Sequence, residues 1–233
     1  MGASVPKVLL PIEGRPLLSY VLESARKAGI TRTIVVVGTQ KEQVVAAFGQ
    51  AGVEFATQAG QHGTADAVLA CRDLLGDDEE CVVLCGDAPL IRPETIRRLS
   101  QARHESSADV AVFTARLADP SGYGRVVRAE GDSVERIVEQ RDATPEVLAI
   151  NEVNSGAYSF RWGRVKPALD RIRPSPVSGE YYLTDIVREV RADGGLVVAV
   201  LASDPNEMLG ANTRDELVAL ERGIAARREQ SAG

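Results

Sequence analysis

Histidine is scarce in this sequence, and long apolar runs are missing. The chain of 233 residues has 2 histidines, so catalysis by a histidine base and a serine or cysteine nucleophile has little material. No apolar segment reaches the roughly 18 residues that a membrane helix requires, and no signal peptide is recognisable. We therefore expect a cytoplasmic protein without a membrane partner.

Cysteine is also rare. The 3 cysteines, Cys71, Cys81 and Cys85, are odd in number and lie in apolar segments, which predicts reduced, buried thiols. Neither His62 nor His104 completes a zinc-ligand spacing, which argues against a zinc site.

A surplus of positive charge is missing as well. The formal net charge of −6 argues against a nucleic-acid-binding surface. An anionic substrate would have to be attracted by local lysine, arginine or metal rather than by the overall field. The hydrophobic fraction of 44% and the charged fraction of 26% are typical of a globular protein with a full core.

The first half of the chain alternates strands and helices. The predicted helices are Leu17–Ala28, Gln40–Phe48, Thr64–Leu74 and Pro93–Ala102, and the predicted strands are Thr33–Val37, Val53–Thr57 and Cys81–Cys85. This alternation predicts an α/β fold with a Rossmann-like, doubly wound and mostly parallel sheet.

The pattern changes after the strand predicted at Asp109–Ala115. Strands and loops, rather than further strand–helix units, are expected between Gly124 and Ser159. The remaining predictions are helices at Phe160–Ile172, Thr184–Ala192 and Thr213–Gln230 and a strand at Val197–Leu201. A single domain that carries a small β-rich lobe is the simplest organisation.

The stretch Cys81–Leu90 (CVVLCGDAPL) is central to the functional interpretation of the sequence. Its apolar run predicts a strand buried on both faces, and Gly86 and Pro89 end that strand. Asp87 then follows the carboxyl end of the strand, which is the edge where open α/β sheets bind ligands. Its carboxylate is a candidate ligand for Mg²⁺, although a turn or helix-capping aspartate fits the spacing equally well.

Two further segments carry candidate binding groups in the first half of the chain. Gln58–Ala67 (QAGQHGTADA) joins a strand to a helix, where backbone N–H groups could meet a base, a ribose or a phosphate. A glycine turn with Thr64 as helix cap explains the same residues without a ligand. Lys7 could contact phosphate oxygens or could simply face solvent.

Three polar residues stand out in the second half. Glu139 could accept hydrogen bonds from sugar hydroxyls or an amide, or could face water. Asn154 enters an apolar strand, an unusual place for an amide side chain. Asn212 precedes a predicted helix, where asparagine is first of all a capping residue.

Taken in order, these stretches resemble the uridyltransferase half of the bifunctional bacterial enzyme family that makes UDP-N-acetylglucosamine. The matching motifs are PKVL (Pro6–Leu9), QxxxxGT (Gln58–Thr64), GDAPL (Gly86–Leu90), DPSGYGR (Asp119–Arg125), IVEQRDAT (Ile137–Thr144), EVNSGAY (Glu152–Tyr158), GEYYLTD (Gly179–Asp185) and GANTR (Gly210–Arg214). The similarity extends from Met1 to about Glu229.

The resemblance implies a nucleotide-diphospho-sugar transferase fold and a sugar-nucleotide pyrophosphorylase. UTP and N-acetylglucosamine 1-phosphate would give UDP-N-acetylglucosamine and pyrophosphate, with Mg²⁺ as cofactor. Residues 1–118 would form the nucleotide-binding part, 119–204 the sugar-binding part, and 205–233 the C-terminal metal-site segment and helix.

The resemblance also implies a role for each matching residue. The metal ligands would be Asp87 and Asn212, and Lys7 would neutralise phosphate charge. The nucleotide would lie against Gln58, Gly63, Thr64, Cys85, Gly86 and Asp87, of which Gln58, Gly63 and Thr64 would read the uracil. The amino sugar would be held by Gly124, Glu139 and Asn154.

The start of the sequence departs from the family pattern. Family members begin with a strand and a loop of the form L-x-x-G-x-G-T-R-M, and Met1 falls at the last position of that loop. We therefore expect the first strand, which is central in this fold, to be missing and the sheet to be interrupted. A misassigned start codon or a fragment would explain this, and upstream codons that encode no such strand and loop would contradict it.

Other departures are smaller. The acetyltransferase half of the family does not follow the helix at Thr213–Gln230, so we expect no acetyl transfer. Cys85 replaces a tyrosine that many relatives carry, and Asp66 replaces a small residue. Two alternatives stay open: a related enzyme that uses another sugar 1-phosphate or dTTP, and a non-catalytic sugar-nucleotide-binding domain.

Overall fold

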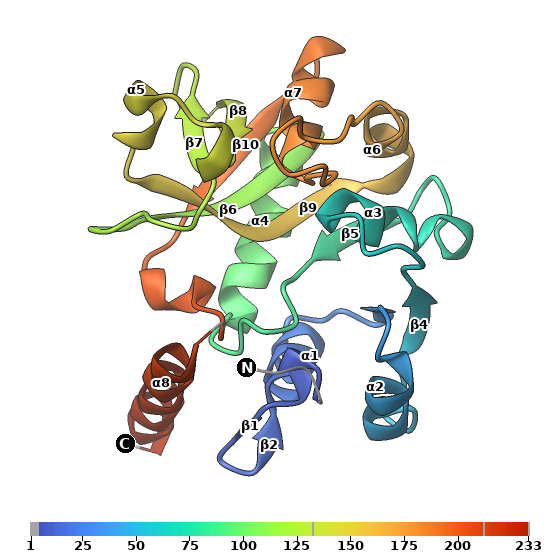
Figure 1. Ribbon diagram of the computed structural model, residues 1–233, viewed down its shortest axis with the longest axis vertical. Helices are drawn as coiled ribbons and strands as arrows, with labels where there is room; N and C mark the ends of the chain where they lie inside the picture. Colours follow the sequence, from blue (N-terminus) through green and yellow to red (C-terminus); the bar gives the residue numbers. More distant parts are fainter. Residues whose placement is uncertain (1–4, 132, 212, 233) are drawn as a thin grey trace.

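The computed structural model of the protein describes residues 5–131, 133–211 and 213–232. Its first part alternates short strands and helices (Figure 1). The elements are η1 (Lys7–Leu9), β1 (Pro11–Ile12), β2 (Arg15–Pro16), α1 (Leu17–Lys27), β3 (Ile34–Val37), α2 (Lys41–Phe48), β4 (Glu54–Thr57), α3 (Thr64–Leu69), η2 (Arg72–Leu74), β5 (Glu80–Val83) and α4 (Pro93–Glu105).

The second part is richer in strands, as the sequence predicted. Its elements are β6 (Val110–Arg116), β7 (Arg125–Arg128), β8 (Val134–Val138), η3 (Gln140–Asp142), α5 (Pro145–Leu148), β9 (Glu152–Arg161), α6 (Trp162–Leu169), α7 (Asp185–Ala192), β10 (Val197–Leu201), η4 (Pro205–Met208) and α8 (Arg214–Ala232). Within the described ranges, no helix is long and apolar enough to cross a membrane.

The main sheet is mixed and is organised around β9. Its strand order is β10-β6-β9-β7-β8, and β5 also pairs with β9. Strand β10 runs parallel to β6, whereas β9 runs antiparallel to β5, β6 and β7. The predicted α/β fold is confirmed, and the reversed strand β9 is inserted between strands that share one direction.

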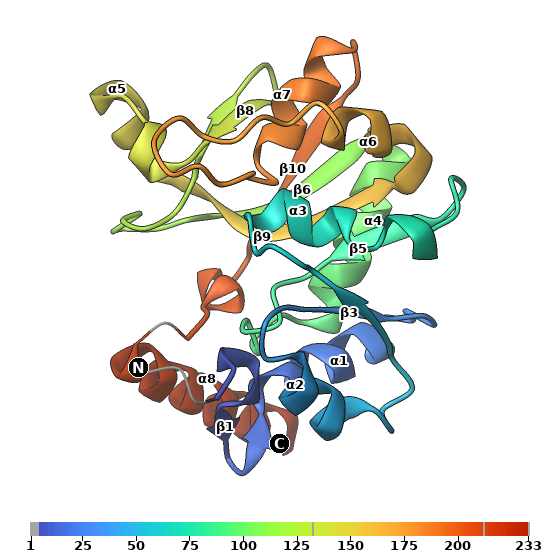
Figure 2. The ribbon, with the colours of Figure 1, turned by 45° about the vertical axis from the view of Figure 1, so that its right-hand side comes forward.

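Strands β3 and β4 form a separate parallel pair (Figure 2). Among the described residues, β3 pairs only with β4 and β5 pairs only with β9. The parallel strands of the first half therefore belong to two sheets, which agrees with the expected interruption. Val8 and Leu9 of η1 pack in the same apolar cluster as Val35 and Val37 of β3.

Helices cover both faces of the main sheet because its strands are apolar on both sides. In β6, Val110 and Val112 pack into a cluster with α3, α6 and α7. Ala111 and Phe113, which point the other way, pack into a cluster with α1 and α4. This two-sided burial is the doubly wound arrangement that the unbroken apolar runs predicted.

Two predicted helices are replaced by other structure over part of their length. Phe160 was expected to begin a helix, but it is part of β9, where it pairs with Cys81 and Val110. Its fully buried ring belongs to the core, so tertiary packing extends the strand and α6 begins at Trp162. The helix predicted at 64–74 ends at Leu69, and a separate 3-10 turn follows at Arg72–Leu74.

Strand β9 contains an irregularity that matters for the site. Its pairing with β6 passes from Tyr158↔Val112 to Asn154↔Thr114, so β9 holds extra residues in between. Gly156 adopts φ +83° there, a conformation that favours glycine. Such a bulge bends the strand and increases its twist. The two ends of β9 can therefore serve different parts of the molecule.

The C-terminal helix α8 closes the structure beside the β1–β2 hairpin. Leu220 and Ile224 of α8 share an apolar cluster with Ile12, Leu17 and Leu90. Leu90 belongs to the GDAPL motif, so this cluster ties the C-terminal segment to the loop that carries Asp87.

We expect Phe113→Ala to lower the free energy of unfolding by about 3–5 kcal/mol, because it leaves a cavity between β6 and α4. The side chain of Phe113 is 0% exposed. Urea unfolding measures the change. The control is Val177→Ala at a side chain that is 62% exposed, which should change stability by less than about 0.5 kcal/mol. Equal effects of the two substitutions would contradict this assignment of the core.

Candidate active site

Asp87 and Lys7 meet beyond the end of β5. The Lys7 Nζ atom lies 3.0 Å from Asp87 Oδ2, and the Asp87 side chain is 25% exposed. Both residues were selected from the sequence as candidates for the phosphate and metal end of a site. An ion pair this open contributes at most about 1 kcal/mol to stability, so stability alone does not account for it.

The segment that follows η4 packs directly against Asp87. A Cβ atom on Gly210 would lie 3.4 Å from Asp87 Oδ2, which is ordinary van der Waals contact. Buried Glu207 fixes the segment, because its Oε2 accepts a hydrogen bond of 3.0 Å from the backbone N–H of Arg92. Asn212, the second predicted metal ligand, lies outside the described residues.

The described residues contain no group of three or more histidine, cysteine, aspartate or glutamate side chains that could hold a metal. Asp87 thus belongs to no such group among the described residues. A Mg²⁺ site does not require such a group, because Mg²⁺ often binds through one or two carboxylates together with substrate phosphates and water.

Cys85 and Gly86 connect the strand to Asp87. The Cys85 thiol faces β9, where it donates a weak hydrogen bond of 3.7 Å to the Ser155 carbonyl. Burial raises the pKa of this thiol to about 12, so it stays protonated. A Cβ atom on Gly86 would lie 3.2 Å from Val8, so glycine allows η1 to approach. The thiol therefore contributes packing, and only the backbone of this turn is left to face a ligand.

Gln58, Gly63 and Asp66 form a compact hydrogen-bonded loop between β4 and α3. Gln58 Nε2 donates to the Gly63 carbonyl and to Asp66 Oδ2, each at 2.9 Å. Asp66 Oδ2 also accepts from the backbone N–H of His62 at 3.2 Å. A Cβ atom on Gly63, which has φ +122°, would lie 2.4 Å from the Tyr181 carbonyl oxygen. Gly63 is therefore required by the fold as well as proposed for binding.

The same loop is joined to the GEYYLTD segment. The Tyr181 N–H donates to the His62 carbonyl at 2.7 Å, and the Ala65 N–H donates to the Tyr181 carbonyl at 2.9 Å. The Leu183 N–H donates to Thr64 Oγ1 at 2.9 Å. The alternative that Thr64 caps its helix is wrong: Gly63 occupies the capping position, and Thr64 receives a bond from the distant segment.

Gly124, Glu139 and Asn154 are brought together on the other side of that segment. The Asn154 N–H donates to the Gly124 carbonyl at 2.9 Å. A Cβ atom on Gly124 would lie 3.3 Å from Glu139 Oε1. Thr184 Oγ1 donates to Glu139 Oε1 at 3.0 Å. The structure thus unites the three residues that were expected to hold a sugar, and it adds Thr184 as their neighbour.

Asn154 has a structural task as well. Its Oδ1 accepts from the Gly156 N–H at 3.1 Å, inside the bulge of β9. The Cys85 sulfur lies 2.6 Å from the position of a Gly156 Cβ atom. The bulge thus contacts both Cys85, which is two residues before Asp87, and Asn154, which lies beside Gly124 and Glu139.

Glu139 has an acidic environment. Burial raises the pKa of its carboxyl group, and the carboxylates of Asp142, Asp185 and Glu180 add to the increase. The hydrogen bond from Thr184 acts in the opposite direction. A half-buried acceptor in acidic surroundings suits neutral donors, such as hydroxyl or amide groups, better than it suits an anion.

Two residues in this region were not assigned a role from the sequence. Thr184 lies within the GEYYLTD motif, and the contact with Glu139 is visible only in three dimensions. Asp66 was noted as an unusual residue in its loop, but its two hydrogen bonds were not predicted.

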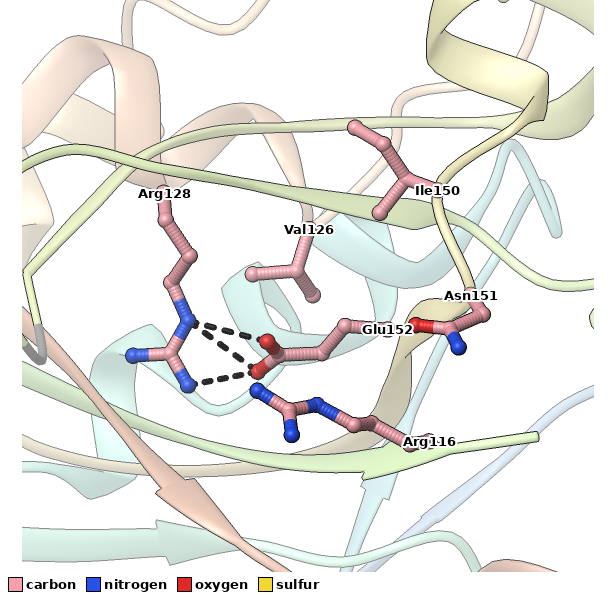
Figure 3. Close-up of a pocket in the computed structure, with 6 residues that line it drawn as sticks. All are labelled: Arg116, Val126, Arg128, Ile150, Asn151 and Glu152. Carbon is pink, nitrogen blue, oxygen red and sulfur yellow. Dashed lines mark hydrogen bonds and ion pairs between the residues drawn. The ribbon is translucent and has the colours of Figure 1, made fainter.

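A separate pocket of about 400 Å³ lies in the small lobe (Figure 3). None of the residues predicted from the sequence to form the site lines it. Buried Glu152 pairs there with Arg128, with Arg128 Nε 3.0 Å from Glu152 Oε2, and accepts from Thr114 Oγ1 at 2.7 Å. These bonds fix the start of β9, two residues before Asn154.

Comparison with known proteins identifies relatives over nearly the whole chain. A sequence model described as nucleotidyl transferase matches residues 1–205. The bifunctional protein GlmU of Bordetella petrii is 44% identical over 240 residues, covering 100% of this chain and 52% of that protein. GlmU of Aquifex aeolicus is 42% identical over 228 residues, covering 94% of this chain and 49% of that protein. The chain thus spans about half the length of the curated relatives it matches.

A solved structure supports the fold independently. The crystal structure of UDP-glucose pyrophosphorylase complexed with UDP-glucose matches with a TM-score of 0.73 and 18% sequence identity. The match covers 96% of this chain and 91% of that chain. At this level of identity the likeness establishes the fold alone.

We expect Glu139→Gln to stabilise the protein near pH 7. A carboxyl group whose pKa is raised by folding favours the folded state when protonated, so its charged form costs stability above its folded pKa. The neutral amide removes this cost and can still accept from Thr184. Thermal unfolding at pH 7 should show an increase of about 2–4 °C, equivalent to about 1 kcal/mol.

The difference between Glu139→Gln and the unsubstituted protein should shrink as the pH falls toward the ordinary glutamate pKa of about 4.3, where both side chains are neutral. Glu130→Gln, at an exposed position, is the control. A difference that grows at low pH would show that the Glu139 pKa is lowered rather than raised.

Proposed function

This chain belongs to the nucleotidyl transferase family, and on that basis we propose that it is a sugar-nucleotide pyrophosphorylase. The proposed reaction converts UTP and N-acetylglucosamine 1-phosphate into UDP-N-acetylglucosamine and pyrophosphate. Support comes from the ordered motifs, from the name of the bifunctional relatives, and from the geometry of the site. The observation that carries the proposal is that the bulge of β9 contacts both Cys85, two residues before Asp87, and Asn154, which lies beside Gly124 and Glu139.

The proposed chemistry needs positioning and charge compensation, not a protein nucleophile. A phosphate oxygen of the sugar phosphate attacks the α-phosphorus of UTP, and the bond from that phosphorus to the bridging oxygen of the β-phosphate breaks. Pyrophosphate leaves with the bonding electron pair. Holding the two anionic substrates in line supplies much of the acceleration in such reactions. The scarcity of histidine is consistent with this mechanism.

Lys7 and Asp87 fit the phosphate end of the proposed site. Asp87 would hold Mg²⁺, with Asn212 as the second ligand that the sequence suggests, and the bound ion would compensate negative charge on the phosphates. Lys7 adds a positive charge at the same position, since its ammonium group already lies 3.0 Å from Asp87 Oδ2. The Lys7 ammonium group would stabilise the negative charge that develops on the leaving pyrophosphate.

The sugar end of the proposed site offers a different chemistry. Glu139 and Asn154 would accept from and donate to the hydroxyl and amide groups of the amino sugar, and Gly124 would leave space for it. Thr184 donates to Glu139 Oε1 at 3.0 Å, and in the proposed complex Oε2 would accept from the ligand. The uracil would be read by Gln58, Gly63 and Thr64.

A second candidate function concerns the substrate. The fold likeness to UDP-glucose pyrophosphorylase keeps a related reaction with another sugar 1-phosphate in consideration. dTTP is an alternative nucleotide, and a non-catalytic sugar-nucleotide-binding domain is an alternative from a different class. Turnover and binding measurements separate these alternatives.

We expect Mg²⁺-dependent release of pyrophosphate to be fastest with UTP and N-acetylglucosamine 1-phosphate. The assay compares UTP with dTTP, each combined with N-acetylglucosamine 1-phosphate, glucosamine 1-phosphate and glucose 1-phosphate, with EDTA as the metal-free control. A preference for glucose 1-phosphate would overturn the proposed sugar. A thermal shift with UDP-N-acetylglucosamine but no pyrophosphate release would favour the binding domain.

We expect Asp87→Asn to lower turnover by about 100-fold or more, because it removes the charge that would hold Mg²⁺. The melting temperature should change by less than about 3 °C, since Asp87 contributes only a partly exposed ion pair. Steady-state kinetics at several Mg²⁺ concentrations measures the effect. Asp73→Asn, at an exposed position, is the matched control. A rate for Asp87→Asn close to that of the control would remove Asp87 from the metal role.

A further inference from the structure

The Gln58 side chain is held in one orientation by two acceptors. Its NH₂ group donates to the Gly63 carbonyl and to the Asp66 carboxylate, each at 2.9 Å. An amide rotated by half a turn would place its oxygen against these two oxygens, which carry no hydrogen to donate. The hydrogen-bond network, rather than the shape of the side chain, therefore decides which end of the amide faces inward.

Asp66 is the charged part of this network. Its Oδ2 atom also accepts from the His62 N–H at 3.2 Å, so the carboxylate is fixed relative to the loop backbone. A carboxylate can only accept, whereas serine, threonine or asparagine at this position could also donate. Hydrogen bonds to a charged acceptor are about twice as strong as those between neutral groups. Asp66 thus gives the Gln58 amide a strong preference for one orientation.

The outer end of the amide is left as an acceptor. Gln58 is half-buried, and its Oε1 atom receives no hydrogen bond from the described residues. If Gln58 lies against the base, as the proposed function requires, the base must offer a donor to this oxygen. Uracil and thymine carry an N–H group at N3, whereas cytosine has an unprotonated acceptor nitrogen there.

We propose that Asp66 is a positioning residue that makes Gln58 an acceptor and so selects bases with a ring N–H over cytosine. This inference rests on the proposed function, because it assumes that the loop reads the base of a nucleoside triphosphate. The inference adds Asp66, which would act through Gln58 without contacting the base. If Asp66 only accepted the hydrogen bond from the His62 N–H to stabilise the loop, its substitution would not change the base preference.

The test compares kcat/KM for UTP and CTP, with N-acetylglucosamine 1-phosphate as the second substrate. Asp66→Ala should lower the UTP-to-CTP ratio by about tenfold. The Gln58 amide is then free to rotate, so its oxygen is no longer held against the acceptor nitrogen N3 of cytosine. Asp66→Asn keeps an oxygen that can accept the same hydrogens, so its ratio should stay within about threefold of the unsubstituted protein. Asp73→Asn, exposed and outside the loop, is the control.

Equal losses with UTP and CTP in Asp66→Ala, leaving the ratio unchanged, would overturn the inference and support the structural role. Calorimetry of UDP and CDP binding gives the corresponding ratio of dissociation constants without turnover. If the unsubstituted protein binds UDP but releases no pyrophosphate, the proposed function fails while the binding ratio still tests Asp66. A protein that binds neither nucleotide would overturn both.

A second measurement needs no variant. The side-chain NH₂ protons of Gln58 should exchange with solvent more slowly than those of the exposed Gln50, because both Gln58 protons are hydrogen-bonded. Side-chain amide NMR resolves the two residues. Equal exchange rates would show that the amide is not held, and the inference would fail even if Asp66→Ala did not fold.

Discussion

The pairing of β9 is the constraint on which the rest of the site depends. One edge of this strand is bound to β6, and the other edge is bound first to β7 and then, beyond Gly156, to β5. The bulge between these two regions accommodates the change of partner, since extra residues bend a strand without breaking its sheet. One end of β9 therefore belongs to the part that carries Asp87, and the other end belongs to the part that carries Glu139.

Hydrogen bonds between the two halves of the chain complete this arrangement. The loop at His62–Ala65 is bound to Tyr181 and Leu183, and the next residue, Thr184, is bound to Glu139. A displacement of the loop would therefore be transmitted to the carboxylate within a few bonds. In the proposed reaction, this connection would fix the distance between the base and the sugar, which must be held together before the phosphates can react.

The two carboxylates of the proposed site have opposite environments. Both side chains are partly buried, but Asp87 is paired with Lys7, whereas the pKa of Glu139 is raised by burial and by acidic neighbours. A carboxylate paired with a cation suits cations and phosphates, and a carboxylate among other acidic groups suits neutral polar groups. A chain with a net charge of −6 can therefore bind anionic substrates only where local cations, such as Lys7, outweigh the overall field.

The sequence by itself determined the α/β class and most of the elements in it. Apolar periodicity placed the strand Val197–Leu201 at its observed bounds and the helix at 40–48 within one residue. Ordered motifs also selected Lys7 and Asp87, which form an ion pair in the structure, and Gly124, Glu139 and Asn154, which lie side by side. Such patterns succeed because burial and turn chemistry are recorded in neighbouring residues.

Only the tertiary structure decided the features that depend on distant partners. Phe160 extends β9 because its ring is buried in the core, although its local sequence suggested the start of a helix. Thr64 bonds to Leu183, 119 residues away, and not to its own helix. The same applies to Asp66, whose role depends on the direction of the Gln58 amide. Local patterns contain no information about such bonds, because their geometry is fixed only when the whole core has packed.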